Sequence, residues 1–252
     1  MKEYKYNECI SRFYDIVYER PAFNPALKFY LNEISQTNGA SLEIGVGTGR
    51  IFARALDSGA DIYGIDQSDL MLAKLKEKIS PEEYSRVTIQ DVREFKLDKK
   101  FELIIAPFRM FSHLVTVEDQ LKALKKIHEH LETGGRFIFD VFVPDLNRLL
   151  KDVDNVKEFE GEYEPDKKLE RYVSIKNDNI NQISNLTFKF VWDENGSTKT
   201  DECYFPFRYY HRFEIENLIA RAGFRLEKIY GGFEKKELDE RSNDDFVVVC
   251  IK

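Results

Sequence analysis

Three glycines and three carboxylates are the residues whose spacing best suits ligand binding. The segment LEIGVGTGR, residues 42–50, places Gly45, Gly47 and Gly49 directly after a short apolar run, and Glu43 lies two residues before the first glycine. Glycines in a strand-to-helix turn let the backbone approach a ligand closely. A helix that begins there offers unpaired N–H groups and a partial positive charge. The loop therefore predicts a site for an anionic group beside a carboxylate.

The glycine spacing argues against a bound pyrophosphate. The pattern is G-x-G-x-G followed by arginine, whereas a dinucleotide-binding turn reads G-x-G-x-x-G and a P-loop ends in Gly-Lys-Ser/Thr. The Glu43 carboxylate would repel a pyrophosphate and attract an ammonium group. The loop is thus suited to a zwitterion, with the carboxylate of the ligand at the helix N-terminus and its amine near Glu43. S-Adenosylmethionine presents both groups and also carries a sulfonium charge.

Two further acids end the next two apolar runs. Asp66 lies in YGIDQS and Asp91 in IQDVREF. The Asp66 carboxylate can accept hydrogen bonds from both hydroxyls of a ribose, and the Asp91 carboxylate can accept a hydrogen bond from the exocyclic amine of an adenine. Ligands of open α/β sheets bind outside the carboxyl ends of the strands. Together with the glycine loop, three acids at successive strand ends indicate a binding site for such a ligand more strongly than the loop alone does.

The elements that must position these residues alternate between strand and helix. Short apolar runs rich in Ile and Val are typical of parallel strands covered on both faces; here they are SLEIG, DIYGID, RVTIQD, FELIIA and RFIFDVF. Between them lie GRIFARALDSG, SDLMLAKLKEKI with Ser68 as N-cap, and TVEDQLKALKKIHEHLETGG, expected to be helical from Thr116 to the glycines at 134 and 135. This order predicts a doubly wound α/β sheet.

A second pattern interrupts the first. Residues 151–205 alternate as strands without helices, and Asn195–Gly196 is a strong hairpin signal. We expect an antiparallel meander inserted between residues 1–150 and 206–252, where it covers an acceptor pocket or forms a homodimer contact. After it, HRFEIENLIARAGF predicts a helix, and RLEKIYGGF and DFVVVCIK predict two strands. With no helix between them, one of these strands should run antiparallel to the rest.

Composition limits the classes of partner. The chain has 45 acidic and 38 basic residues and a net charge of -7, and without a basic patch this repels nucleic acid. No apolar run is long enough to span a membrane, and the N-terminal residues lack the apolar stretch of a secretory signal. The three cysteines are odd in number and far apart in the sequence. We expect reduced thiols and a cytoplasmic protein.

Residues 42–143 resemble the class I S-adenosylmethionine-dependent methyltransferases. The resemblance lies in LEIGVGTGR, IYGIDQSDLML, VTIQDVREF, FELIIAPFRMF and LKKIHEHLETGGRFIFDVF, and RAGFRLEKIYGGF and DFVVVCIK fit that family's reversed final strand. It implies a seven-stranded, mostly parallel, Rossmann-like sheet, an S-adenosylmethionine cofactor and methyl transfer to an amine or hydroxyl of a small molecule. The stretches FYDIVY and MFSHL are similar to sugar-nucleotide amino N-methyltransferases.

The resemblance also implies roles for individual residues. Glu43, Gly45, Gly47 and Gly49 would hold the methionine end of the cofactor, Asp66 the ribose, and Asp91 with Val92 the adenine. Gln67 and Met71 would line the ribose and adenine pocket, Ala106 would face the methionine tail, and Tyr14 would cover the cofactor. Each residue also has a structural explanation, as a tight turn, a helix cap or a core side chain.

Catalytic residues are less constrained. The sulfonium donor is already activated, so a base is needed only if the acceptor arrives protonated. His113, which follows the fourth strand, and Tyr18, in the aromatic N-terminal region, are the candidates, and His211 could serve as a base or only as a helix cap. Arg109 and the aromatic run at 207–213 are candidate acceptor-pocket residues. His128 and His130 point in different directions on a helix, so we expect no metal site.

Two other functions remain open at this point. An NAD(P)-dependent oxidoreductase can be built on a similar sheet, although the glycine spacing and Glu43 disfavour it. A protein that binds S-adenosylmethionine without turnover would show the same loop and acids, with an acceptor cavity closed by the insert.

Overall fold

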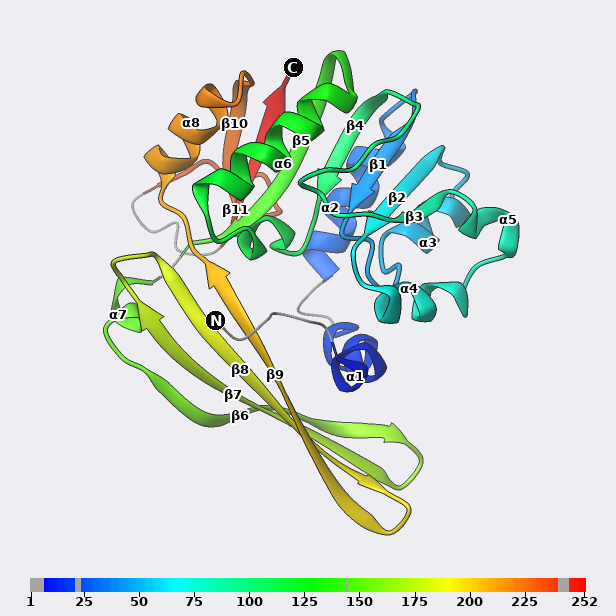
Figure 1. Cartoon of the computed structure of the whole chain (residues 1–252), viewed down its shortest axis with the longest axis vertical. Helices are drawn as coiled ribbons and strands as arrows, with labels where there is room; N and C mark the ends of the chain where they lie inside the picture. Colours follow the sequence, from blue (N-terminus) through cyan, green and yellow to red (C-terminus); the bar gives the residue numbers. More distant parts are fainter. Residues whose placement is uncertain (1–6, 21–23, 144, 240–244) are drawn as a thin grey trace.

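A computed structural model describes residues 7–20, 24–143, 145–239 and 245–252. Two sheets organise the chain (Figure 1). The large sheet has seven strands in the order β10-β11-β5-β4-β1-β2-β3, and the small sheet has four in the order β6-β7-β8-β9. The strands of the large sheet are β1 (Ser41–Ile44), β2 (Ile62–Asp66), β3 (Val87–Ile89), β4 (Phe101–Ala106), β5 (Leu131–Phe142), β10 (Arg225–Gly231) and β11 (Asp245–Ile251).

The large sheet has the predicted topology. The pairs β1–β2, β1–β4, β2–β3 and β4–β5 are parallel, whereas β11 is antiparallel to both β5 and β10. The reversed strand is therefore the last one, and it lies second from the edge. This confirms the doubly wound, mostly parallel seven-stranded sheet.

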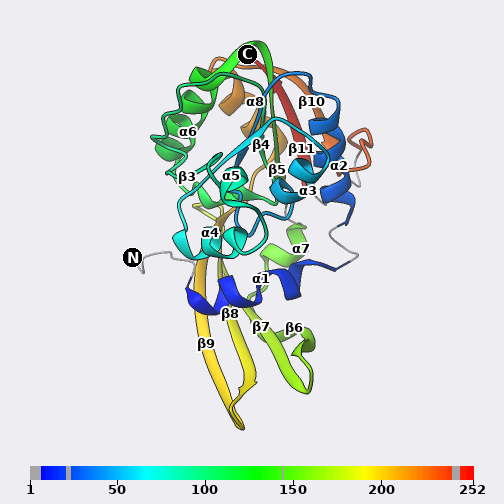
Figure 2. The ribbon, with the colours of Figure 1, turned by 90° about the vertical axis from the view of Figure 1, so that its right-hand side faces the viewer.

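Helices cover both faces of this sheet (Figure 2), and buried side chains form a core between the helices and each face. One face packs against α6 (Val117–His130) and α8 (Arg212–Arg221), and the other against α2 (Asn24–Ser35), α3 (Phe52–Asp57) and α4 (Asp69–Lys76). Shorter helical turns are α5 (Pro81–Tyr84), η2 (Met110–His113) and α7 (Leu146–Leu149). Because both faces are covered, the inner strands β4 and β11 are buried along almost their whole length, which is why the sequence shows apolar runs there rather than alternation.

The helix α6 is shorter than predicted. Thr116 caps its N-terminus by accepting a hydrogen bond from Asp119 N, as expected. The C-terminal prediction is wrong, because the helix ends at His130 rather than at the glycines. Leu131 takes an extended conformation, is 1% exposed and pairs with Phe101 of β4. Burial of this leucine against the sheet thus ends the helix before Gly134.

The small sheet is an antiparallel meander of β6 (Val153–Glu164), β7 (Lys167–Asp178), β8 (Ile183–Glu194) and β9 (Ser197–Arg208). The β8–β9 hairpin turns at Asn195 and Gly196, both with positive φ, as the Asn-Gly signal predicts. Strand β9 continues past residue 205 to Arg208.

The helix α1 (Glu8–Tyr18) lies between the two sheets (Figures 1 and 2). Its apolar side chains Ile10, Phe13 and Val17 pack on the inner face of the small sheet, against Phe159 and Phe190. The chain therefore folds as a covered parallel sheet whose carboxyl edge faces a second layer made of α1 and the meander. In the described part of the chain no helix has the length and apolar character needed to cross a membrane.

Candidate functional site

The glycine loop between β1 and α3 requires glycine for two physical reasons. Gly45 and Gly49 have φ angles of 76° and 83°, in the left-handed region that side chains disfavour. A Cβ at Gly45 would lie 2.6 Å from Met110 Cγ, and one at Gly49 would lie 2.3 Å from Leu75 Cδ1. The loop is therefore packed closely between η2 and α4.

Asp66 fixes the position of this loop. Its Oδ2 accepts a hydrogen bond from Gly47 N at 2.8 Å, and its Oδ1 accepts one from Ser68 N at 2.8 Å. Burial raises the pKa of Asp66 above 3.8, and backbone hydrogen bonds from Ser68, Gly47 and Gln67 oppose that rise. The carboxylate thus joins the ends of β1 and β2. Each oxygen retains a further acceptor site, so a ligand hydroxyl remains compatible with this arrangement.

Glu43 is the most unusual carboxyl of the site. It lies in β1 and is 1% exposed, and its Oε2 has no hydrogen-bond partner among the described residues. Burial, followed by repulsion from Asp66, raises the pKa of Glu43 well above 4.5. A buried polar atom without a partner is costly. An ammonium group bound beside the glycine loop would satisfy this oxygen, so Glu43 fits the amino-acid end of S-adenosylmethionine.

The other predicted cofactor residues lie at the neighbouring strand ends. Asp91 lies two residues after the end of β3, and Gln90 between them donates its N–H to the Asp66 carbonyl at 3.0 Å. Partial burial alone would raise the pKa of Asp91, but hydrogen bonds from Arg93 lower it below 3.8. Among the remaining predicted residues, Met71 and Ala106 are buried, Val92 is half-buried and Gln67 is exposed. Met71 contacts the loop, since its Cε lies 3.4 Å from the Cβ position of Gly47.

The helix α1 is tied directly to the loop. Thr48 Oγ1 donates to Asp15 Oδ1 at 2.5 Å, and Lys78 Nζ donates to Asp15 Oδ2 at 2.6 Å. Arg50 donates to the carbonyl of Tyr18 at 2.9 Å. These contacts bring Tyr14 and Tyr18 over the carboxyl edge of the sheet, with their ring centroids 4.6 Å apart. The predicted covering position of Tyr14 therefore has a structural basis.

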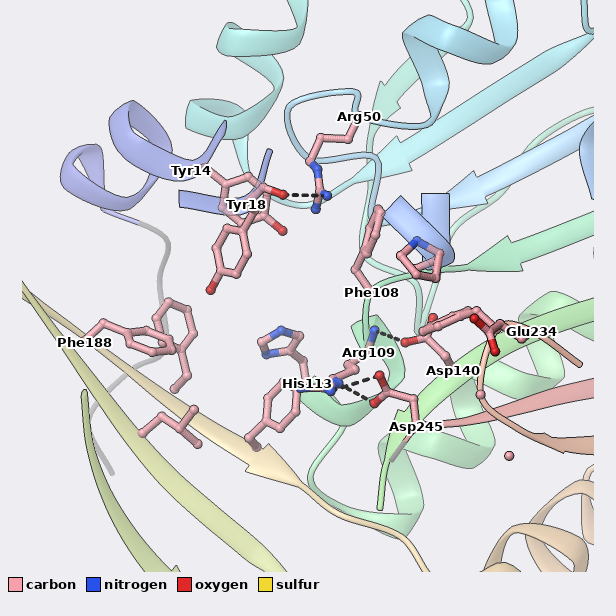
Figure 3. Close-up of a pocket in the computed structure, with 18 of the residues that line it drawn as sticks. Tyr14, Tyr18, Arg50, Phe108, Arg109, His113, Asp140, Phe188, Glu234 and Asp245 are labelled. Carbon is pink, nitrogen blue, oxygen red and sulfur yellow. Dashed lines mark hydrogen bonds and ion pairs between the residues drawn. The ribbon is translucent and has the colours of Figure 1, made fainter. Parts of the chain in front are cut away.

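A cavity of about 480 Å³ lies between the carboxyl edge of the large sheet and the small sheet (Figure 3). One wall is apolar and aromatic and comes from α1, β8 and β9; the opposite wall is charged. The apolar wall includes Ile10, Tyr14, Tyr18, Leu186, Phe188, Phe205 and Phe207, and the charged wall includes Arg109, Asp140, Glu234, Lys236 and Asp245. Of the predicted cofactor residues, Tyr14 lines this cavity and the others lie outside its lining.

Both candidate catalytic residues line the cavity. The His113 ring packs edge-on against Phe205 and Phe207, with centroids 6.1 and 5.2 Å away. Burial lowers the pKa of His113 to about 4, so the imidazole is neutral at pH 7. Tyr18 accepts a hydrogen bond on its hydroxyl from Arg171 of β7 at 2.9 Å. Arg109 and Phe207 also line the cavity, whereas His211 is exposed at the N-cap of α8 and lies outside the lining.

The charged wall contains residues that the sequence did not single out. Asp140, near the end of β5, accepts hydrogen bonds from the Tyr30 hydroxyl at 2.5 Å and from Arg109 N at 2.8 Å. The Arg109 guanidinium donates to both oxygens of Asp245, at 2.6 and 2.9 Å. Burial, followed by repulsion from Asp245, raises the pKa of Asp140 from 3.8 to about 7. Figure 3 shows Arg109, Asp140 and Asp245 on the side of the cavity that faces Tyr14 and Tyr18 of α1.

A sequence signal for Asp140 did exist. It is an acid inside the apolar run RFIFDVF, near the carboxyl end of a buried strand, where an unpaired charge is costly. Its hydrogen-bond partner Tyr30 and its repulsive neighbour Asp245 are far from it in the chain, so their proximity could not be predicted from spacing.

Comparisons with known proteins identify the domain. Residues 42–135 match the family model described as a methyltransferase domain. The chain is 25% identical over 216 residues to the putative methyltransferase YqeM of Bacillus subtilis, covering 81% of each protein. It is also 32% identical over 126 residues to uncharacterized Bacillus methyltransferases, and there it spans 58% of their length.

Solved structures share the whole fold. An S-adenosylmethionine-dependent methyltransferase from Clostridium acetobutylicum superposes with a TM-score of 0.76 at 18% identity, covering 98% of both chains. The sugar N-methyltransferase KedS8 from a Streptoalloteichus species has a TM-score of 0.75 at 15% identity, covering 99% of this chain and 97% of its own. At these identities the likeness shows the fold, including the meander.

Proposed function

Because this chain is a class I S-adenosylmethionine-dependent methyltransferase by its fold and its matched domain, we propose that it methylates an amine or a hydroxyl of a small molecule. The observation that supports this proposal is the cavity of about 480 Å³, whose lining includes Arg50, the residue directly after the glycine loop. Small-molecule sites have volumes of roughly 300–1,000 Å³ and combine apolar walls with a few polar groups. The aromatic and charged walls of this cavity match that description.

The cofactor is proposed to lie across the ends of β1, β2, β3 and β4. Glu43 would accept the ammonium group, and the backbone of the loop at Gly45, Gly47 and Gly49 would lie around the methionine end, with no side chain in the way. Asp66 would accept the ribose hydroxyls. At the adenine end, Asp91 and Val92 would bind the base, with Gln67 and Met71 along the pocket, Ala106 at the methionine tail and Tyr14 above it.

The protein contributes mainly alignment and exclusion of water. When bound, the cofactor supplies a methyl group that is already activated by the sulfonium charge. Tyr14 and Tyr18 of α1, together with Phe205 of β9, close the apolar side of the cavity. Such closure holds an acceptor in line with the methyl group and keeps water from competing. Tyr18 and the neutral His113 are proposed to position the acceptor.

The likeness to KedS8 bears on the type of acceptor. KedS8 is named as a sugar N-methyltransferase, and its likeness over the whole chain supports a sugar-like amine among the possible acceptors. The charged wall with Asp140 and Asp245 is consistent with a polar acceptor. The alternative function, an NAD(P)-dependent oxidoreductase, is disfavoured by the matched domain and by Glu43, which would repel a pyrophosphate.

Calorimetry and an activity screen test the proposal. S-Adenosylhomocysteine should bind to the purified protein, whereas NADH should give no heat of binding. Methyl transfer from labelled S-adenosylmethionine to a panel of amino sugars, simple amines and polyols should then yield a labelled product. Binding of NADH without binding of S-adenosylhomocysteine would overturn the assignment. Binding without transfer to any member of a broad panel would support a protein that binds the cofactor without turnover.

A further inference from the structure

The charged wall of the cavity brings one buried acid close to the proposed acceptor. Asp140 is 1% exposed and still lines the cavity, and its backbone pairs with Val247 of the reversed strand β11. Asp245 lies two residues earlier on β11 and lines the same wall. The reversal of the final strand therefore places an acid from its beginning next to an acid from the end of β5.

The hydrogen bonds of Asp140 come from neutral donors. One is the Tyr30 hydroxyl and the other is the backbone N–H of Arg109. Burial, followed by the Asp140 carboxylate, raises the pKa of Tyr30 well above 10.0, so Tyr30 stays a proton donor. An ionised carboxylate has about four acceptor sites. Two are used here, which leaves capacity for a ligand in the cavity.

Among the described residues, the positively charged groups on this wall are bound to carboxylates other than Asp140. The guanidinium of Arg109 directs both of its hydrogen bonds to Asp245. On the β10–β11 segment, Lys236 pairs with Glu234 at 2.7 Å. When Asp140 is ionised, two carboxylates among the described residues of this wall therefore face the one guanidinium of Arg109, which is bound to Asp245. The unbalanced negative charge of these described residues then lies at Asp140. A buried charge of this kind is stable only when paired.

A protonated amine is the ligand that would complete this wall. Resting on the proposed function, we propose that Asp140 binds the acceptor as an ammonium ion and takes its proton before methyl transfer. The acceptor class is then a primary or secondary amine. A hydroxyl would neither supply the missing positive charge nor lose its proton to a carboxylate.

The step balances in atoms and charge. An oxygen of Asp140 takes one proton from the ammonium ion, which leaves a lone pair on nitrogen. That pair forms the new bond to the methyl carbon, the carbon–sulfur bond breaks, and its electrons stay with sulfur. The positive charge moves from sulfur to the methylated nitrogen, and Asp140 later releases its proton to water. An acid with a pKa near the working pH is the most effective group for this transfer.

The proposed role of Asp140 predicts how kcat/KM depends on pH. In the part of the chain that the structure describes, the groups that face Asp140 are Tyr30 of α2, Arg109 before η2 and Asp245 of β11, and Glu234 and Lys236 line the same cavity. Since the pKa of Asp140 is about 7, the carboxylate form is lost as the pH falls below that value. The kcat/KM for an amine acceptor should therefore fall on the acid side with that midpoint.

Carbon-13 NMR of labelled aspartate tests the assignment without knowledge of the natural acceptor. With S-adenosylhomocysteine bound, the Asp140 carboxyl should titrate near neutral pH, and Asp140→Asn identifies its signal. Ethylammonium should lower this midpoint by about one unit or more, because an adjacent cation favours the carboxylate. The neutral probe 1-propanol should leave the midpoint in place. A midpoint that does not respond to ethylammonium would overturn the assignment.

Two variants, together with the binding of S-adenosylhomocysteine, distinguish failure of the proposed role of Asp140 from failure of the proposed function. Asp245→Asn removes a repulsive neighbour, so it should lower the Asp140 midpoint while the response to ethylammonium remains. Asp140→Asn should reduce kcat/KM for an amine found in the screen by roughly 10²- to 10⁴-fold and remove the acid limb of the profile. If S-adenosylhomocysteine itself does not bind, the proposed function fails. If it binds and Asp140 is insensitive to ethylammonium, only the role of Asp140 fails.

Discussion

Thr48 donates a hydrogen bond from its hydroxyl to Asp15 of α1 at 2.5 Å, and thereby joins the glycine loop to the helix that lines the cavity. Lys78 strengthens the junction, because its ammonium donates both to Asp15 at 2.6 Å and to the Thr48 carbonyl at 2.9 Å. The same helix packs on the small sheet through Phe13 and Val17. The loop, the covering helix and the wall of the cavity are therefore mechanically connected.

Loss of the hydrogen bond between Thr48 and Asp15 should weaken the attachment of α1 to the glycine loop. Thr48→Val keeps the shape of the side chain and removes its donor, so we expect S-adenosylhomocysteine to bind several-fold more weakly, corresponding to about 1 kcal/mol. Amide hydrogen exchange in α1 should become faster. Thr37→Val is a matched control, because the Thr37 hydroxyl donates to the backbone carbonyl of Glu33 near the end of α2. Equal effects of the two variants on binding would contradict this role.

Glu43 should make cofactor binding depend on pH. Burial, followed by Asp66, raises the pKa of this carboxyl above 4.5, and pairing with an ammonium group would favour its charged form. Binding of S-adenosylhomocysteine should therefore release a proton, and its affinity should rise with pH. Calorimetry in buffers of different ionisation enthalpy measures this release. Glu43→Gln should abolish it and weaken binding by about 1.5–3 kcal/mol; an unchanged proton release would exclude Glu43 as its source.

Gly49 should be less replaceable than a glycine with the same backbone angle elsewhere. Gly49 and Gly134 have φ angles of 83° and 78°, so alanine costs about 1–2 kcal/mol of backbone energy at either position. At Gly49 the new Cβ also meets Leu75 at 2.3 Å, whereas nothing lies within 4 Å at Gly134. Gly49→Ala should lose about 1–3 kcal/mol more in urea unfolding. Equal losses would show that Leu75 moves aside freely.

His113 should not be the source of an acid limb near neutral pH. Its pKa is about 4 because the ring is buried against the aromatic wall, so the imidazole is neutral throughout the range in which Asp140 titrates. His113→Gln should change kcat or KM through packing and leave the midpoint of the acid limb unchanged. The pH profile of kcat/KM, with wild type measured in parallel, checks this. Loss of the limb in His113→Gln would transfer the base role from Asp140 to His113.

The order of elements could be predicted because it depends on local patterns. Buried parallel strands appear as continuous apolar runs, Ser68 and Thr116 cap the helices that follow them, and Asn195–Gly196 forms the predicted hairpin turn. The end of α6 could not be predicted in this way. Leu131 leaves the helix because it is buried beside Phe101, and that contact joins residues from different elements.

The candidate site shows the same difference between residues predicted from local patterns and residues brought together by contacts between distant segments. The sequence by itself determined the glycine loop and the acids at 43, 66 and 91, because parallel strands bring their carboxyl ends to one edge of the sheet and spacing along the chain is then enough. Only the tertiary structure decided what faces that edge. The reversal of β11 places Asp245 near Asp140, Tyr30 arrives from another helix, and the meander supplies the opposite wall. Such contacts depend on packing between distant segments, and no local pattern of residues encodes them.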